Sequence, residues 1–400
     1  MRIALFTETF LPKIDGIVTR LKNTIEELRR QGDQVLVFAP GEGITEYEGA
    51  EIVRSPGMPF PLYPELTIAL PRSSIRRKLL EFKPDLIHVA DPAILGLAGL
   101  YYGDVLHVPL VASYHTQIPK YVHYYGFGAT EGLVWTLMRA RHNRANLNLC
   151  TSTAMFEELR ANGIERVRLW PPAVNTELFH PRFATSEMRC ELAGQLGDAP
   201  LFLYVGRLSA EKEIEKLRCI FEAMPGARLA IVGGGPHRGR LESYFAGTAT
   251  HFAGYMTGQR LAAAMGSVDA LILPSRTETL GLVLIEAMAA GSVVVGARAG
   301  GVPDLVDDGV TGFMFNPDEP GDLKRVVQRV ARDSELMKVI RDRARQKSEE
   351  WNWAASTAQL RRFYEEAIAT PRKEKSALAN AFLMQAMKRT MIGGIKVFLG

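Results

Sequence analysis

The stretch from Arg276 to Gly291 constrains the possible folds of this chain more than any other. It follows an apolar segment, Ala270–Leu273, that predicts a buried strand. Good helix formers from Leu282 to Ala290 then predict a helix, and Gly291 is the residue type that ends helices. Gly281 stands at the start of this helix, where backbone amides are unpaired and uncovered by a large side chain. Such a helix start favours an anion, for example a phosphate.

Two carboxylates flank this helix start. Glu278 precedes the helix and Glu286 lies within it, eight positions further on. At about 1.5 Å of rise per residue this spacing is at most roughly 12 Å, which is comparable to the reach from a sugar ring across a diphosphate to a ribose. A carboxylate accepts two hydroxyl hydrogen bonds, so each glutamate is suited to hold one sugar. The alternative is an amphipathic helix with a surface glutamate at each end, but Glu286 lies in an apolar run where an unpartnered charge is costly.

Residues 276–291 resemble the Glu-x7-Glu motif of the retaining glycosyltransferases of family GT4. In that family the first glutamate contacts the donor sugar and the second contacts the ribose of the nucleotide. The resemblance therefore implies these roles for Glu278 and Glu286. It also implies that the residues at the helix start bind the donor, namely Thr279, Leu280, Gly281 and Leu282.

A second pair of charged residues, Arg207 and Lys212, follows the apolar segment Leu201–Val205. The arginine is a planar fork and the lysine a point charge, and together they are suited to flank a diphosphate. Taken alone, a pair of surface cations is the simpler explanation. The segment resembles the Gly-Arg-x4-Lys donor-phosphate motif of GT4, however, which favours the functional role. The chain has no Asp-x-Asp, so we expect a transferase with no metal site and no cofactor besides its nucleotide-sugar substrate.

Four further positions match the family. His115 follows a predicted strand; a lone histidine is more often structural, but in GT4 a histidine here faces the donor sugar near its C6 substituent. Gly16 resembles the glycine of the family's flexible loop, where a missing side chain lets the diphosphate approach the backbone. Gly254 and Tyr255 match the region that contacts the base. Together with Glu278, Arg207 and Lys212, His115 completes the predicted catalytic group.

Within GT4 the chain looks closest to the sulfoquinovosyltransferases of plants and cyanobacteria. The matching segments are Ile75–His88, Ser113–Thr116, Arg168–Trp170, Phe179–Phe183, Glu187–Arg189 and Glu278–Val283. The resemblance implies that sulfoquinovose moves from UDP-sulfoquinovose to diacylglycerol, which forms a sulfolipid. A sulfonate in a closed cleft requires positive charge near C6 of the sugar, and we expect Lys120 to supply it. The linker Pro171–Asn175 departs from the family, which usually shows Gly-Val-Asp there, so domain closure is less constrained.

Three other functions stay open. One is a related lipid hexosyltransferase that uses UDP-glucose or GDP-mannose. The others are a sugar-nucleotide epimerase, which can share the two-domain fold, and a non-catalytic nucleotide-sugar binding protein. The joint presence of both glutamates, both cations and His115 favours the transferase.

The predicted elements indicate an α/β protein. A strand at 3–6, a helix at 17–30 and a strand at 34–38 form a βαβ unit, which favours a parallel sheet. Five prolines between residues 56 and 71 predict an extended loop. A second set of strands starts at Leu201. We therefore expect two doubly wound Rossmann-like domains facing a cleft, the GT-B fold that the resemblance also implies. The expected divisions are an acceptor-side domain at 1–172, a donor-binding domain at 173–350, a helix at 351–370 that crosses back, and a tail at 371–400.

Charge is concentrated in that tail. Residues 371–400 carry six basic residues and one acidic residue, a net of +5, whereas the whole chain has a net charge of +4. Apolar residues between Ala377 and Ile392 recur at helical spacing, which predicts a basic amphipathic helix on an anionic membrane or, alternatively, a helix packed on the protein. A basic tail does not indicate nucleic-acid binding. Three dispersed cysteines and no secretory signal favour a cytoplasmic protein, here associated peripherally with a membrane (the plasma or thylakoid membrane in a cyanobacterium).

Overall fold

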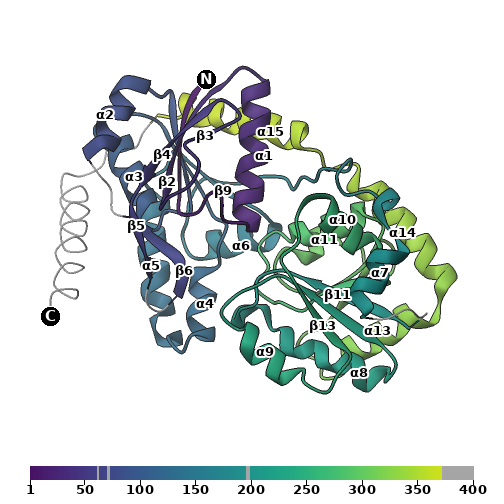
Figure 1. The fold of residues 1–400 in the computed structure, drawn as a ribbon. Helices are drawn as coiled ribbons and strands as arrows, with labels where there is room; N and C mark the ends of the chain where they lie inside the picture. Colours follow the sequence, from purple (N-terminus) through teal and green to yellow (C-terminus); the bar gives the residue numbers. More distant parts are fainter. Residues whose placement is uncertain (61–62, 70–72, 195–198, 372–400) are drawn as a thin grey trace.

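The first domain is built on an eight-stranded sheet in the order β10-β9-β8-β7-β1-β2-β4-β3 (Figure 1). The computed structural model describes residues 1–60, 63–69, 73–194 and 199–371. Neighbouring strands pair in parallel except for β3 and β4. The strands are β1 (Arg2–Thr7), β2 (Gln34–Pro40), β3 (Glu46–Tyr47), β4 (Ala50–Ser55), β7 (Leu86–Ala90), β8 (Leu110–Ser113), β9 (Leu147–Cys150) and β10 (Val167–Leu169).

Helices cover both faces of this sheet. They are α1 (Gly16–Arg30), α2 (Ser73–Phe82), α3 (Leu95–Val105), α4 (Ile118–Tyr124), η1 (Gly128–Thr130), α5 (Glu131–His142) and α6 (Thr153–Ala161). Helix α1 begins at Asp15, whose carboxylate accepts a hydrogen bond from the Val18 amide at 2.8 Å. Leu21, Ile25 and Leu28 recur at helical spacing on its buried face. This packing fixes the start of α1, and therefore Gly16, at the carboxyl end of β1.

The second domain has a six-stranded parallel sheet in the order β13-β12-β11-β14-β15-β16. Its strands are β11 (Leu201–Val205), β12 (Arg228–Val232), β13 (Thr250–Gly254), β14 (Ala270–Leu273), β15 (Val293–Ala297) and β16 (Phe313–Phe315). The helices from the linker onward are η2 (Pro181–Phe183), α7 (Ser186–Ala193), η3 (Ala210–Lys212), η4 (Ile214–Arg218), α8 (Cys219–Ala223), α9 (Arg238–Tyr244), α10 (Gly258–Gly266), α11 (Leu282–Ala289), α12 (Val302–Leu305), α13 (Asp322–Arg332) and α14 (Ser334–Ser348). Two doubly wound sheets confirm the predicted α/β class.

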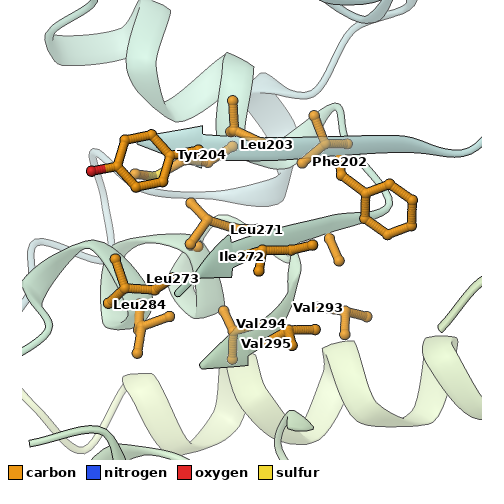
Figure 2. Close-up of a cluster of buried hydrophobic side chains, with 14 of the residues drawn as sticks. Phe202, Leu203, Tyr204, Leu271, Ile272, Leu273, Leu284, Val293, Val294 and Val295 are labelled. Carbon is orange, nitrogen blue, oxygen red and sulfur yellow. The ribbon is translucent and has the colours of Figure 1, made fainter. Parts of the chain in front are cut away.

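The central strands β14 and β15 of the second sheet are apolar without interruption because both faces of the sheet are covered there. Figure 2 shows side chains of β11, β14 and β15 packed together with Leu284 of α11. Leu203, Ile272 and Val294 are fully buried in this cluster. The core thereby fixes where β14 ends and where α11 begins, and the loop between them carries Glu278.

The proline-rich segment differs from its prediction. Instead of an unpaired loop, β5 (Gly57–Phe60) and β6 (Tyr63–Ala69) form an antiparallel hairpin. The backbone is extended as the prolines require, and a two-stranded ribbon tolerates proline because each strand has one edge that needs no N–H donor.

The last described helix, α15 (Trp353–Ala369), follows the second domain in sequence but lies against the first, beside α1 (Figure 1). Leu360 and Tyr364 are buried in the first domain's core with residues of β1 and α1. Arg361 forms an ion pair with buried Asp33 at 2.8 Å. Helix α15 therefore packs its buried side chains against the first sheet and α1.

Candidate active site

The start of α11 presents backbone amides at the carboxyl end of the second sheet. Gly281 is the N-cap residue, and its φ of +83° lies in the left-handed region that favours glycine. The N-cap has no side-chain hydrogen bond within the described part of the chain. The Gly281 amide itself donates to Glu278 Oε1 at 3.2 Å. The helix start is thus suited to an anion, with one carboxylate at its edge.

A glycine pair holds the backbone of Glu278 in place. The Glu278 carbonyl accepts a hydrogen bond from the Gly301 amide at 2.8 Å. A Cβ on Gly300, whose φ is +57°, would lie 2.1 Å from the same carbonyl oxygen. Only glycine fits there, so these two residues define the position of the Glu278 side chain. The sequence analysis missed this pair, although two adjacent glycines after a strand were a usable signal.

The two predicted phosphate-binding cations both have carboxylate partners. Arg207 forms an ion pair with Glu211, and Lys212 Nζ lies 2.8 Å from Glu278 Oε2. Lys212 ends η3, a single 3-10 turn. The predicted sugar-binding glutamate and phosphate-binding lysine therefore neutralise each other in this structure.

Glu211 organises the phosphate-binding segment, and the sequence analysis missed it. Its side chain is fully buried and accepts hydrogen bonds from Ser209 Oγ at 2.6 Å and from the Tyr125 hydroxyl at 2.9 Å. Burial by itself would raise the pKa of Glu211, but Arg207 and these donors hold it below its ordinary value. Its spacing of four residues from Arg207 was the available signal.

Glu286 lies half-buried on α11, eight positions after Glu278. Within the described ranges, no hydrogen-bond or ion-pair partner of its carboxylate is present. Burial raises the pKa of Glu286 to about 8. A carboxyl group in this setting gains free energy when a ligand brings hydroxyl donors to it.

His115 occupies the matching position on the first domain, directly after β8. Its backbone amide donates to Asp91 Oδ1 at 2.7 Å, and Thr116 Oγ1 donates to Asp91 Oδ2 at 2.7 Å. Burial raises the pKa of Asp91 to about 7, and burial together with the nearby Arg20 lowers that of His115. Asp91 follows β7 directly, so its place at a strand end would have identified it from the sequence.

Direct hydrogen bonds join the two domains at this site. Thr279 Oγ1 donates to the His115 carbonyl at 2.8 Å, and Thr151 Oγ1 donates to the Thr279 carbonyl at 2.9 Å. Tyr125, the C-cap residue of α4, donates to Glu211 of η3. The carboxyl ends of both sheets therefore converge, which brings His115 and the loop of Glu278 together.

Two family models match the chain. "Glycosyltransferase Family 4" matches residues 14–178, and "Glycosyl transferases group 1" matches residues 193–347. The sulfoquinovosyl transferase of Arabidopsis thaliana is 38% identical and covers 94% of this chain and 75% of that relative. The chain belongs to glycosyltransferase family 4.

Other relatives of this family 4 glycosyltransferase are named for different activities. A GDP-mannose-dependent alpha-mannosyltransferase of Mycobacterium tuberculosis is 35% identical over 79% of this chain and 84% of its own length. The structure of Anabaena HepE in complex with UDP-glucose superposes with a TM-score of 0.73 at 20% identity, covering 91% of this chain and 99% of that one. The shared architecture confirms the GT-B fold.

The remaining predicted residues of the family 4 site lie around its rim. A Cβ on Gly16 would be 3.8 Å from Leu282 Cδ1 of the other domain, and the side chain of Leu280 is buried. Gly254 ends β13, and the Tyr255 side chain after it is 67% exposed. The side chain of Lys120 is half-exposed and its Nζ lies 3.2 Å from Glu158 Oε1. None of these contacts assigns a role, so the predicted roles of the site residues remain proposals.

Two other kinds of feature are absent from the described ranges. No group of three or more His, Cys, Asp or Glu side chains is arranged to hold a metal ion. Among the helices of those same ranges, none combines the length and the apolar character needed to cross a membrane.

Proposed function

We propose that this family 4 enzyme transfers sulfoquinovose from UDP-sulfoquinovose to diacylglycerol and retains the anomeric configuration. The observation that carries the proposal is the hydrogen bond between Thr279 Oγ1 and the His115 carbonyl, at 2.8 Å. It joins the two segments that the family uses on either side of the donor sugar. The 38% identity to a sulfoquinovosyl transferase over nearly the whole chain supports the choice of sugar.

In this proposal the donor lies along the loop and first turn of α11. Glu286 accepts hydrogen bonds from the ribose hydroxyls, and Glu278 and His115 contact the sugar. Arg207, Lys212 and the α11 amides face the diphosphate. When UDP leaves, its charge grows, and the cations and amides stabilise that charge more in the transition state than in the ground state. The leaving phosphate oxygen takes the proton of the acceptor hydroxyl on the same face of the sugar, so no covalent nucleophile is required.

We also propose that the reaction needs no metal and no cofactor beyond the nucleotide sugar, because Arg207 and Lys212 supply the positive charge. Full activity in excess EDTA is the expected result. A rate that EDTA abolishes and Mg²⁺ restores would contradict this part of the proposal.

Lys120 is the proposed partner of the sulfonate. In the structure its Nζ is engaged with Glu158 at 3.2 Å, so the donor has to draw Lys120 away. Lys120→Ala is expected to slow transfer from UDP-sulfoquinovose more than transfer from UDP-glucose. An equal loss with both donors would show that Lys120 does not recognise the sulfonate.

The second candidate is a lipid hexosyltransferase that uses UDP-glucose or GDP-mannose, and the 35% identity to a GDP-mannose-dependent enzyme favours it. The deciding experiment incubates the pure protein with diacylglycerol liposomes and a panel of labelled sugar nucleotides. A sulfoquinovosyl lipid supports the main proposal, and another glycolipid supports the second candidate. An isomerised sugar nucleotide would indicate an epimerase, and binding without turnover would indicate a binding protein.

We further propose that residues 1–172 and 173–350 act as the acceptor and donor domains, and that the enzyme works at an anionic membrane surface in the cytoplasm. The predicted amphipathic tail at 371–400 lies outside the described residues, apart from residue 371. Deletion of 372–400 is expected to weaken binding to anionic liposomes, more at low salt than at high salt. Undiminished sedimentation of the truncated protein with liposomes would exclude the tail as the anchor.

A further inference from the structure

A continuous series of buried hydrogen bonds runs from α15 to His115. The Tyr364 hydroxyl lies 2.8 Å from His88 Nδ1, and His88 Nε2 lies 2.9 Å from Ser113 Oγ. Ser113 Oγ lies 2.8 Å from His115 Nε2. All four side chains are buried; they come from α15, β7, β8 and the segment directly after β8. We call this series the histidine relay; it connects the crossing helix to the residue proposed to face the donor sugar.

The hydrogens of the relay can be assigned by counting donors and acceptors. In the described ranges, His88 Nδ1 is the one partner of the Tyr364 hydroxyl. The cavity beside it, of about 10 Å³, is lined mainly by apolar side chains, and the one hydroxyl group among them other than that of Tyr364, Thr24 Oγ1, forms no hydrogen bond with it. A buried hydroxyl hydrogen without an acceptor costs about 1–3 kcal/mol. Tyr364 therefore donates to His88 Nδ1, and the proton of neutral His88 is on Nε2.

The same count of donors and acceptors assigns the proton of His115. Ser113 Oγ accepts from His88 Nε2, so its single hydrogen is directed to His115 Nε2. A neutral imidazole carries one proton, which leaves the proton of His115 on Nδ1. Burial and then the positive charge of Arg20 lower the pKa of both histidines, so each stays neutral. Nδ1 has no partner within the described chain and is the atom left for a ligand.

We propose that Tyr364, His88 and Ser113 are positioning residues that fix His115 as the neutral tautomer with its proton on Nδ1, so that it donates a hydrogen bond to the C6 substituent of the donor sugar. The identity of that substituent rests on the proposed function. A sulfonate only accepts hydrogen bonds, whereas a hydroxyl both donates and accepts. A histidine held as a fixed donor therefore suits a sulfonate in particular.

The first test is nitrogen NMR of the intact protein with ¹⁵N-labelled histidine and no donor, with His115 assigned from the spectrum of His115→Gln. Wild type is expected to show His115 protonated at Nδ1. In Tyr364→Phe, His88 Nδ1 has no hydrogen-bond partner, whether or not it carries the proton of His88. Neither arrangement of protons along the relay is then favoured, so about half of the His115 population should carry its proton on Nε2. A wild-type proton on Nε2, or an unchanged His115 signal in Tyr364→Phe, would overturn the proposal.

Matched variants separate tautomer control from packing. Tyr114 is also fully buried, but its hydroxyl has no partner among the described residues. Tyr114→Phe removes a buried hydroxyl from the residue that precedes His115 in the sequence and should leave the tautomer unchanged. Ser113→Ala should give a mixture of the two His115 tautomers. Ser113→Thr should preserve the Nδ1–H tautomer, because threonine keeps the hydroxyl. If Ser113→Ala fails to fold, the comparison of Tyr364→Phe with Tyr114→Phe decides the question.

The second test measures donor selectivity. If half of the Tyr364→Phe molecules carry the wrong tautomer, their apparent affinity for a donor that needs Nδ1–H falls about twofold or more. Tyr364→Phe should bind UDP-sulfoquinovose more weakly than wild type does, and its loss of affinity for UDP-glucose should be smaller. An equal loss with both donors would refute the sulfonate preference while leaving the NMR result intact. If the enzyme uses neither donor, the proposed function fails, whereas the NMR test still decides the relay.

Discussion

Lys212 Nζ lies 2.8 Å from Glu278 Oε2, and both side chains are only 16% exposed. The residue proposed to bind the diphosphate and the residue proposed to bind the sugar therefore form an ion pair with each other. An incoming donor has to separate them, because its phosphates compete for the lysine and its sugar hydroxyls compete for the glutamate. The pair keeps both charges compensated in a partly buried site until the donor replaces each partner.

Removing either cation is expected to impair chemistry more than binding. Arg207→Ala and Lys212→Ala should lower kcat by about 10²-fold or more, because their charges oppose charge that grows as UDP leaves. Steady-state kinetics with varied donor would measure kcat and KM separately. Lys216 is a matched control, since its Nζ pairs with Glu213 at 3.0 Å in the same segment, and Lys216→Ala should change kcat little. A variant at Arg207 or Lys212 that only raises KM would argue against the proposed role.

Glu286 should make the free protein less stable as pH rises. Burial raises its folded pKa from 4.5 to about 8. The folded state then holds a proton that the unfolded chain releases, so stability is lost progressively between about pH 4.5 and pH 8. Glu286→Gln removes this titration. Its melting temperature should equal that of wild type at pH 5 and exceed it by a few degrees at pH 8.5, where about 1 kcal/mol corresponds to roughly 2–4 °C. If the difference in melting temperature between Glu286→Gln and wild type is the same at both pH values, ionisation of Glu286 does not cause the loss of stability.

The same carboxyl group should contribute to donor binding. Glu286→Ala is expected to weaken donor affinity at about pH 9, where the Glu286 carboxyl is ionised, by about 1.5–3 kcal/mol, the usual worth of hydrogen bonds to a charged group. Isothermal calorimetry with UDP would measure the loss, and UDP suffices because the ribose is the proposed partner. An unchanged affinity for UDP would remove Glu286 from the site.

Elements set by local chemistry were predictable from the sequence. The strands at 201–205 and 270–273 match the structure residue for residue, because each is an apolar run bounded by turn residues. The helix after Gly281 was predictable for the same reason, since glycine marks both of its ends. Glu278 and Glu286 could be identified because their relationship is a spacing along one short segment.

Relationships between distant parts of the chain were not predictable in this way. Tyr364 and His88 are 276 positions apart, and only the return of α15 to the first domain brings them together. The contact between Tyr125 and Glu211 depends on how two domains face each other, which no local pattern specifies. The ion pair between Lys212 and Glu278 was not predictable either. The sequence motif identifies the lysine, but it does not specify which residue the lysine contacts when no donor is bound.

The contact between Tyr125 and Glu211 provides a test of domain closure. The Tyr125 hydroxyl donates to Glu211 Oε2 at 2.9 Å across the two domains, and Tyr124 makes a longer contact of 3.4 Å with Glu213. A hydrogen bond to a charged group contributes about 1.5–3 kcal/mol, so Tyr125→Phe should increase the open population of the free protein about tenfold or more.

Small-angle X-ray scattering without donor should then give a larger radius of gyration for Tyr125→Phe than for wild type, and UDP should restore the smaller value. Tyr124→Phe is the matched control, because it removes a phenol hydroxyl from the same helix at a weaker contact and should leave the radius nearly unchanged. Donor affinity should fall in Tyr125→Phe in proportion to the closed fraction. If both variants scatter like wild type, the tyrosine does not hold the domains together, and closure depends on the contacts of Thr279 instead.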